Sequence, residues 1–100
     1  MIHSAEEFFA LPTSSVPEEY RRAAHEEASP GVWHDVMERY PQLRSWVAHN
    51  KTVPLTVLVL LASDQDPDVR SAVADKRKLT IELFRQFACD PDDGVRARIA

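Results

Sequence analysis

The 100-residue chain contains a single cysteine, Cys89, and only two glycines. One cysteine excludes an internal disulfide framework and a cysteine cluster for zinc or an iron–sulfur centre. Two glycines leave almost no room for a glycine-rich phosphate-binding loop. The longest apolar stretch, residues 57–62, is far shorter than a membrane span.

Recognisable catalytic patterns are also lacking. We find no Ser-His-Asp or Cys-His arrangement that would support nucleophilic catalysis. The four histidines are not spaced as paired metal ligands on one helix; they are His3, His25, His34 and His49. The sequence therefore predicts a protein that is not an enzyme and that carries no metal and no cofactor.

The net charge of the chain indicates which class of partner to expect. The formal net charge is −4 at pH 7, whereas a general phosphate-binding protein normally carries a net basic balance. A neutral or basic partner suits this charge better. The first residues lack a basic region followed by an apolar run, so we expect no signal peptide and a cytoplasmic location.

A spacing of 26 residues organises most of the chain. It relates residues 43–48 to 69–74 and 95–100, residues 53–58 to 79–84, and residues 61–64 to 87–90. A fixed period of this size is typical of a helical solenoid, in which each unit buries its apolar face against its neighbours. The sequence predicts an all-α fold with no strand.

Two regions follow from this pattern: an N-terminal helical cap over residues 1–28 and a repeat array over residues 29–100. Capping residues followed by apolar positions at helical spacing predict where the helices begin. The expected N-caps are Ser4, Ser15, Ser29, Thr52, Asp66, Thr80 and Asp92. Pro41 is expected to end the helix that begins at Ser29.

Two segments carry a family resemblance. Val-Arg-x-x-Val-Ala at residues 69–74 and Leu-x-x-Leu-Ala-x-Asp at residues 58–64 resemble the leucine-rich repeat variant branch of HEAT-like repeats, and the likeness covers about residues 30–100. The chain is also similar to small bacterial HEAT-like proteins with a turn of the type found at residues 47–54. The resemblance implies a right-handed α-solenoid of about three units that binds protein or nucleic acid. Some members carry an N-terminal iron–sulfur cluster, but the cysteines for it are missing here.

Arg44, Arg70 and Arg96 occupy equivalent places in three units. They predict either a stripe that binds anions or, as we favour, inter-repeat pairs with carboxylates. The candidate carboxylates are Asp64, Asp66, Asp68, Asp90 and Asp92.

A second basic feature lies in the turns between helices. Lys51 and the run Lys76, Arg77 and Lys78 fall in corresponding turns and could form a basic edge. Together with Arg44 and Arg70 they define the alternative hypothesis, which is a nucleic-acid-binding protein. Solvated turn charges are the simpler interpretation.

The positions facing outward give the leading hypothesis. If Leu55, Leu58, Leu61 and Ala62 face the core, their equivalents Ile81, Phe84, Phe87 and Ala88 do the same. The outward residues of successive units then include His34 with Asp35, Val59 with Leu60, and Arg85 with Gln86. Val59 and Leu60 are apolar where both neighbouring units are polar, which indicates an interaction patch. The alternative is that Phe8 and Phe9 fold over them.

Trp46 is a second candidate anchor for a protein partner, and packing against the N-terminal segment is the alternative. Val95 and Ile99 are expected to need cover, either from a partner or by self-association through that end of the array. The leading prediction is a protein–protein interaction module, such as an adaptor or an immunity or antitoxin-like protein.

Overall fold

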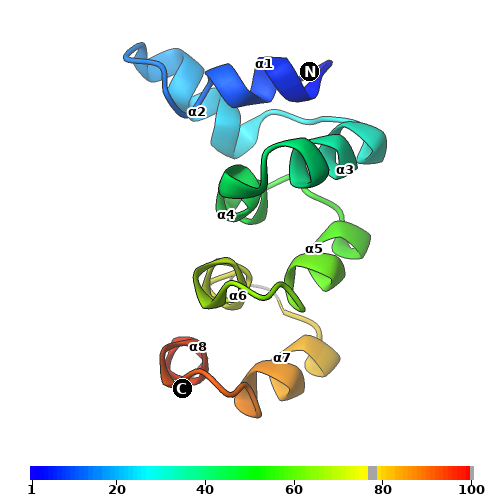
Figure 1. Ribbon diagram of the computed structural model, residues 1–100, viewed down its shortest axis with the longest axis vertical. Coiled ribbons are helices and arrows are strands. Elements are labelled where there is room, and N and C mark those ends of the chain that lie inside the picture. Colours follow the sequence, from blue (N-terminus) through cyan, green and yellow to red (C-terminus); the bar gives the residue numbers. More distant parts are fainter. Residues whose placement is uncertain (77–78, 100) are drawn as a thin grey trace.

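The computed structural model describes residues 1–76 and 79–99, and all regular secondary structure within them is helical (Figure 1). The described residues form α1 (Ala5–Ala10), α2 (Pro17–His25), α3 (Pro30–Arg39), the 3-10 helix η1 (Pro41–Leu43), α4 (Arg44–His49), α5 (Leu55–Leu61), α6 (Pro67–Ala74), α7 (Ile81–Ala88) and α8 (Asp93–Arg98). Ile2 and Ala28 form an isolated parallel bridge, and no strand occurs in the described residues. The prediction of an all-α fold is confirmed.

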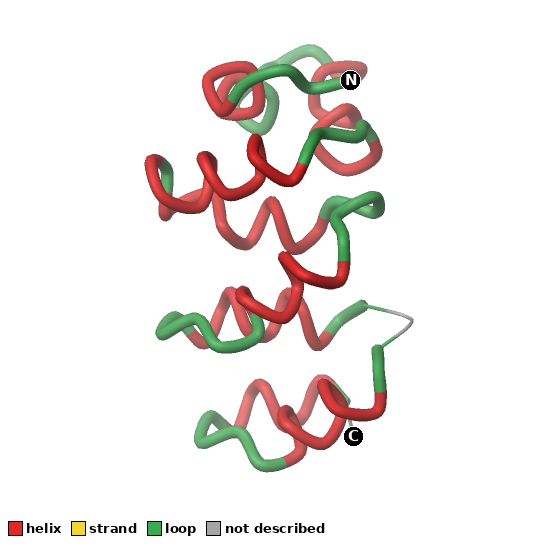
Figure 2. Tube along the Cα trace, turned by 90° about the vertical axis from the view of Figure 1, so that its right-hand side faces the viewer, coloured by secondary structure: helices red, strands yellow, loops and turns green. Residues whose placement is uncertain are grey.

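The helices lie in two rows. One row contains α2, α4, α6 and α8, and the other contains α1, α3, α5 and α7 (Figure 1). Along the first row α4 packs against α2 and α6, and α6 packs against α8; along the second, α3 packs against α1 and α5. The chain passes from row to row through short turns (Figure 2). The molecule measures 36 × 25 × 22 Å along its principal axes. The core lies between the rows.

Side-chain caps begin four of these helices as predicted. The hydroxyl of Ser4 accepts a hydrogen bond from the backbone N–H of Glu7 at 3.1 Å, and Thr80 accepts one from Leu83 at 3.2 Å. The remaining two are aspartates: Asp66 caps α6 and Asp92 caps α8. Each cap satisfies donors that the first turn of a helix leaves unpaired.

Two predicted caps are wrong. The N-cap of α2 is Val16 rather than Ser15, and no side chain caps this helix. Thr52 lies too far ahead of α5, which begins at Leu55 after the N-cap Pro54. The predicted cap Ser29 does occupy the N-cap position of α3, but its hydroxyl makes no capping hydrogen bond. The prolines at the starts of α2 and α3 explain these cases in part, because proline has no N–H that needs a cap.

The sides of α5 and α7 that face the core differ from the predicted sides by part of a helical turn. Val57 and Leu61 are the buried residues of α5, and Leu83 and Phe87 are those of α7. Residues four apart share a helix face, so the face that contacts α6 is centred on these pairs. The outcome for the predicted core residues is mixed: Leu61, Ala62 and Phe87 are buried, Leu58 is half-buried, and Leu55, Ile81, Phe84 and Ala88 are exposed.

The aromatic residues of the N-terminal segment pack against α3 and its C-terminal end. Phe8 meets Trp33 edge to face, with ring centroids 5.3 Å apart, and Phe9 lies 4.7 Å from Tyr40. Neither phenylalanine covers Val59 or Leu60, so that alternative is wrong. Such aromatic pairs tie the N-terminal segment to the common core.

Val95 does not need cover from outside the described structure. Its side chain is fully buried, and α8 contacts both α6 and α7. The expectation that Val95 waits for a further helix is therefore wrong. Ile99 is half-buried against the same core.

Candidate interaction surface

The outer side of α5 is apolar. Leu55, Val59 and Leu60 expose about half of their side chains, and the polar Thr56 lies among them. With an advance of about 100° per residue, Leu55, Thr56 and Val59 fall on the side opposite the buried pair Val57 and Leu61, and Leu60 lies on the flank next to Val57. The helix is apolar all round, although only one of its sides faces the core.

The next helix of the row, α7, extends this apolar character. Ile81 and Phe84 are exposed, and they alternate with the polar residues Glu82 and Arg85. We call the exposed apolar residues of the two helices the α5–α7 surface; they are Leu55 (50% exposed), Val59 (47%), Leu60 (51%), Ile81 (61%) and Phe84 (48%). Five of the nine large apolar residues exposed in the described part of the chain belong to it. Single exposed apolar residues are ordinary, whereas contiguous groups of them are typical of an interaction site.

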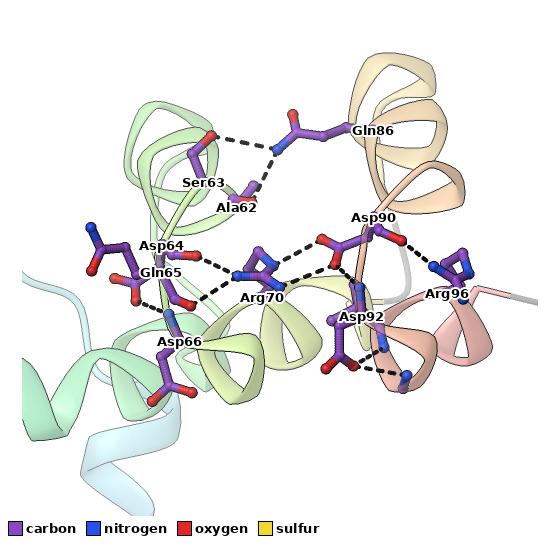
Figure 3. Close-up of polar contacts among 12 residues, drawn as sticks. Ala62, Ser63, Asp64, Gln65, Asp66, Arg70, Gln86, Asp90, Asp92 and Arg96 are labelled. Carbon is purple, nitrogen blue, oxygen red and sulfur yellow. Dashed lines mark hydrogen bonds and ion pairs between the residues drawn. The ribbon is translucent and has the colours of Figure 1, made fainter.

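The other predicted surface residues have different surroundings. Arg85 is exposed on α7, whereas the amide of Gln86 donates to the carbonyl of Ala62 at 3.0 Å and so ties α7 to the end of α5 (Figure 3). His34 is exposed on α3, and the carboxylate of Asp35 pairs with Arg39 at 3.2 Å. Of these four residues, Gln86 is the one that contacts both helices of the surface.

Trp46 packs against the N-terminal segment. It is half-buried on α4 and meets the Tyr20 ring edge to face, with centroids 5.2 Å apart. This is the packing alternative that the sequence left open. Its role as an anchor for a partner stays a prediction.

The equivalent arginines join successive units of the chain. Arg44 pairs with Asp64 at 2.9 Å, and Arg70 grips both carboxylate oxygens of Asp90 at 2.8 and 3.1 Å (Figure 3). Both pairs span 20 residues. Arg96 donates to the backbone carbonyl of Asp90. Arg44 and Arg70 thus make the carboxylate pairs that we favoured. The carboxylate partner of Arg96 is instead Asp93 of the same helix, which was not among the predicted partners.

Asp90 is nearly buried and remains a carboxylate. Burial by itself raises its pKa, but hydrogen bonds from the Arg70 guanidinium and from the backbone N–H of Asp92 outweigh burial. The pKa of Asp90 therefore lies below its usual range. The buried ion pair is an internal tie and offers no free charge to a ligand.

The two described lysines of the turns, Lys51 and Lys76, differ in their contacts. The ammonium of Lys76 donates to the backbone carbonyl of Asn50 at 2.6 Å, while Lys51 is exposed. Arg77 and Lys78, also predicted for the basic edge, lie outside the described residues. Four of the six residues predicted to bind nucleic acid lie in the described part of the chain. Of these four, Lys51 alone is exposed.

Asn50 is a structural residue that the sequence reading missed. Its side chain is fully buried, and its amide donates to the carbonyls of Ala23 and Glu26 at 2.9 and 3.0 Å. Its side-chain oxygen accepts from the backbone of Thr52 at 2.8 Å. In sequence, an asparagine between a helix and a polar run reads as an ordinary turn residue, so no signal distinguished it.

Two further findings concern the described residues as a set. No group of three or more His, Cys, Asp or Glu side chains lies where it could hold a metal ion within residues 1–76 and 79–99. No helix there is long and apolar enough to cross a membrane.

Comparison with known proteins gives no assignment. The chain has no significant match to any protein-family model, to any curated protein or to any solved structure.

Proposed function

We propose that this chain is a protein-binding module without catalytic activity and that the α5–α7 surface is its contact site. The observation that carries the proposal is the gathering of five half-exposed apolar side chains on two neighbouring helices. Removing such side chains from water is the main favourable term in protein association. Glu82 and Arg85 supply the polar rim that a reversible contact needs.

The architecture that we propose for this role is a HEAT-like solenoid of about three units with an N-terminal helical cap. The two rows of helices support it, as do the two Arg–Asp pairs, each of which joins residues 20 positions apart. In such an array the helices of one row present a continuous face to a partner. Its net charge of −4 favours a neutral or basic partner, as in an adaptor or an immunity-like protein.

We further propose a cytoplasmic location. The single cysteine, Cys89, is exposed as a free thiol. Exposed free thiols persist in a reducing compartment and are oxidised readily outside it.

Nucleic-acid binding is less well supported than protein binding. Arg44 and Arg70 would have to leave Asp64 and Asp90 before they could contact phosphate. Titration of duplex DNA or RNA at low and moderate salt tests this role, because phosphate contacts lose affinity by orders of magnitude over that range. We expect no salt-sensitive binding.

Capture from the cells that naturally make the chain tests the protein-binding proposal. Val59→Asp places a charge on the exposed side of α5, within the α5–α7 surface, and is expected to remove the captured partner. Val16→Asp is the matched control, because Val16 is exposed to nearly the same extent, 44% against 47%, but lies at the start of α2. An identical set of captured proteins for both variants would refute the proposed surface.

A further inference from the structure

A cleft of about 610 Å³ lies between the turn that follows α4 and the C-terminal end of α6. Val53, Leu58 and Ala72 supply the apolar part of its lining. Its volume falls in the range of sites that bind small organic molecules, which are roughly 300–1,000 Å³. The cleft is separate from the outer side of α5 that forms the α5–α7 surface.

The polar lining of the cleft is predominantly basic. Among the described residues, Lys51, Lys76 and His49 line it together with the carboxylate of Asp75. The Asp75 carboxylate is shared with Arg98, whose guanidinium lies 3.4 Å away outside the cleft lining. The cleft therefore concentrates positive charge on a protein whose net charge is negative.

Lys76 is held in place before any ligand arrives. Its ammonium donates to the backbone carbonyl of Asn50 at 2.6 Å, and Asn50 is itself fixed by its buried hydrogen bonds. Burial of Lys76, together with repulsion from Lys51, lowers the pKa of this lysine. A negative group placed between the two ammonium groups would relieve that repulsion and compensate for the lost hydration.

We propose that this cleft binds a small amphiphilic anion, an acid group attached to an apolar body. The acid group lies between the ammonium groups of Lys51 and Lys76, and the apolar body covers Val53, Leu58 and Ala72. Ligand sites typically combine an apolar lining with a few convergent polar groups in this way. The inference is independent of the protein-binding proposal, because none of the five residues of the α5–α7 surface lines the cleft.

Titration of the folded chain followed by amide NMR tests this inference. The probes are octanoate, octyl phosphate and octanol, each kept below the concentration at which it self-associates. We expect saturable shifts at Val53, Ala72 and Lys76 with at least one of the two acids, and the stronger of the two identifies the acid group. Octanol, which has the same apolar body without charge, is expected to bind at least about tenfold more weakly.

Lys51→Gln provides the variant test, since Lys51 is exposed and its loss leaves the core intact. We expect about a fivefold to tenfold loss of affinity for the acid, as for one ion pair near a protein surface. Arg21→Gln removes an exposed charge from α2 and is expected to leave binding unchanged. Three results would each overturn the inference: no saturable shift with either acid, equal binding of octanol, or an unchanged affinity in Lys51→Gln.

Discussion

Asn50 shows how one buried polar side chain ties together distant turns. Its amide and carbonyl groups reach Ala23, Glu26 and Thr52, and its backbone carbonyl receives Lys76. A fully buried amide would be costly without these partners. With them it joins the end of α2 to the turns that follow α4 and α6.

Changing Asn50 to Asp tests this tie. The substitution keeps the size of the side chain but places a carboxylate oxygen against the carbonyls of Ala23 and Glu26. We expect a loss of about 3 kcal/mol or more in the free energy of unfolding, measured by urea denaturation. Gln42→Glu is the control, because it makes the same amide-to-acid change at an exposed position and should cost under about 0.5 kcal/mol. Equal losses in both variants would contradict the assigned role.

The Arg70–Asp90 pair is the most buried ion pair in the described structure, with side chains 13% and 5% exposed. Arg70→Met would leave the Asp90 carboxylate buried without its partner. We expect a loss of about 3–5 kcal/mol, as for other broken buried pairs. Arg98→Met breaks the exposed pair with Asp75, whose side chains are 54% and 40% exposed, and should cost under about 1 kcal/mol. Chemical denaturation of both variants measures the difference, and similar costs would show that Arg70 is not an internal tie.

The helices themselves are short, at six to ten residues, and isolated helices of this length are marginal in water. Hydrogen bonds that cap the ends of these helices therefore contribute to the stability of the fold. The carboxylate of Asp92 accepts from the backbone N–H groups of Gly94 and Val95 at 2.8 and 3.1 Å. Asp92→Ala is expected to cost about 1 kcal/mol of stability. Ser29→Ala is the control, because Ser29 is the N-cap of α3 but makes no capping hydrogen bond, so thermal melting should change little.

We expect the contact between the amino group of Met1 and the C-terminal end of α2 to depend on pH. Hydrogen bonds from the Arg22 guanidinium, followed by that from the terminal amino group of Met1, lower the pKa of Glu26 from 4.5 to about 2. A carboxylate whose pKa is lowered by folding stabilises the native state above its ordinary pKa. That contribution is fully present above about pH 4.5 and is lost as the pH falls toward 2.

Glu26→Gln tests this dependence. We expect the variant to be less stable than the parent chain by about 1 kcal/mol at pH 7, since the network is at the surface. The two chains should converge in stability as the pH approaches 2, in urea titrations over this range. A difference that stays constant across the range would contradict the proposed linkage.

Taken as a whole, the molecule follows its sequence repeat in some respects and not in others. The 26-residue spacing predicted the Arg–Asp pairs, because Arg44 and Arg70 are equivalent in the sequence and pair with the equivalent residues Asp64 and Asp90. The inward side of α5 could not be predicted, since every residue from Leu55 to Leu61 except Thr56 is apolar. When nearly every residue of a helix is apolar, the spacing of the apolar residues does not show which side of the helix faces the core. The contacts of α5 with α3, α4 and α6 bury Val57 and Leu61 in the core.

The candidate surface, too, could be predicted from the sequence only in part. Val59 and Leu60 were predicted from the comparison of units, because polar residues at the equivalent positions marked them as outward. Leu55, Ile81 and Phe84 were missed, since apolar residues conserved in register between two units read as core. Comparing the units reveals positions at which one unit is apolar and its neighbours are polar. It does not reveal exposed positions that are apolar in both units.

The most direct test of the protein-binding account is site-specific photo-crosslinking in the cells that naturally make the chain. A photoreactive amino acid at Thr56 lies among Leu55, Val59 and Leu60, and one at Arg21 on α2 serves as the reference. We predict a discrete cross-linked protein from position 56 that is missing from position 21 and disappears with Val59→Asp. The same products from both positions, or none from position 56, would contradict the account.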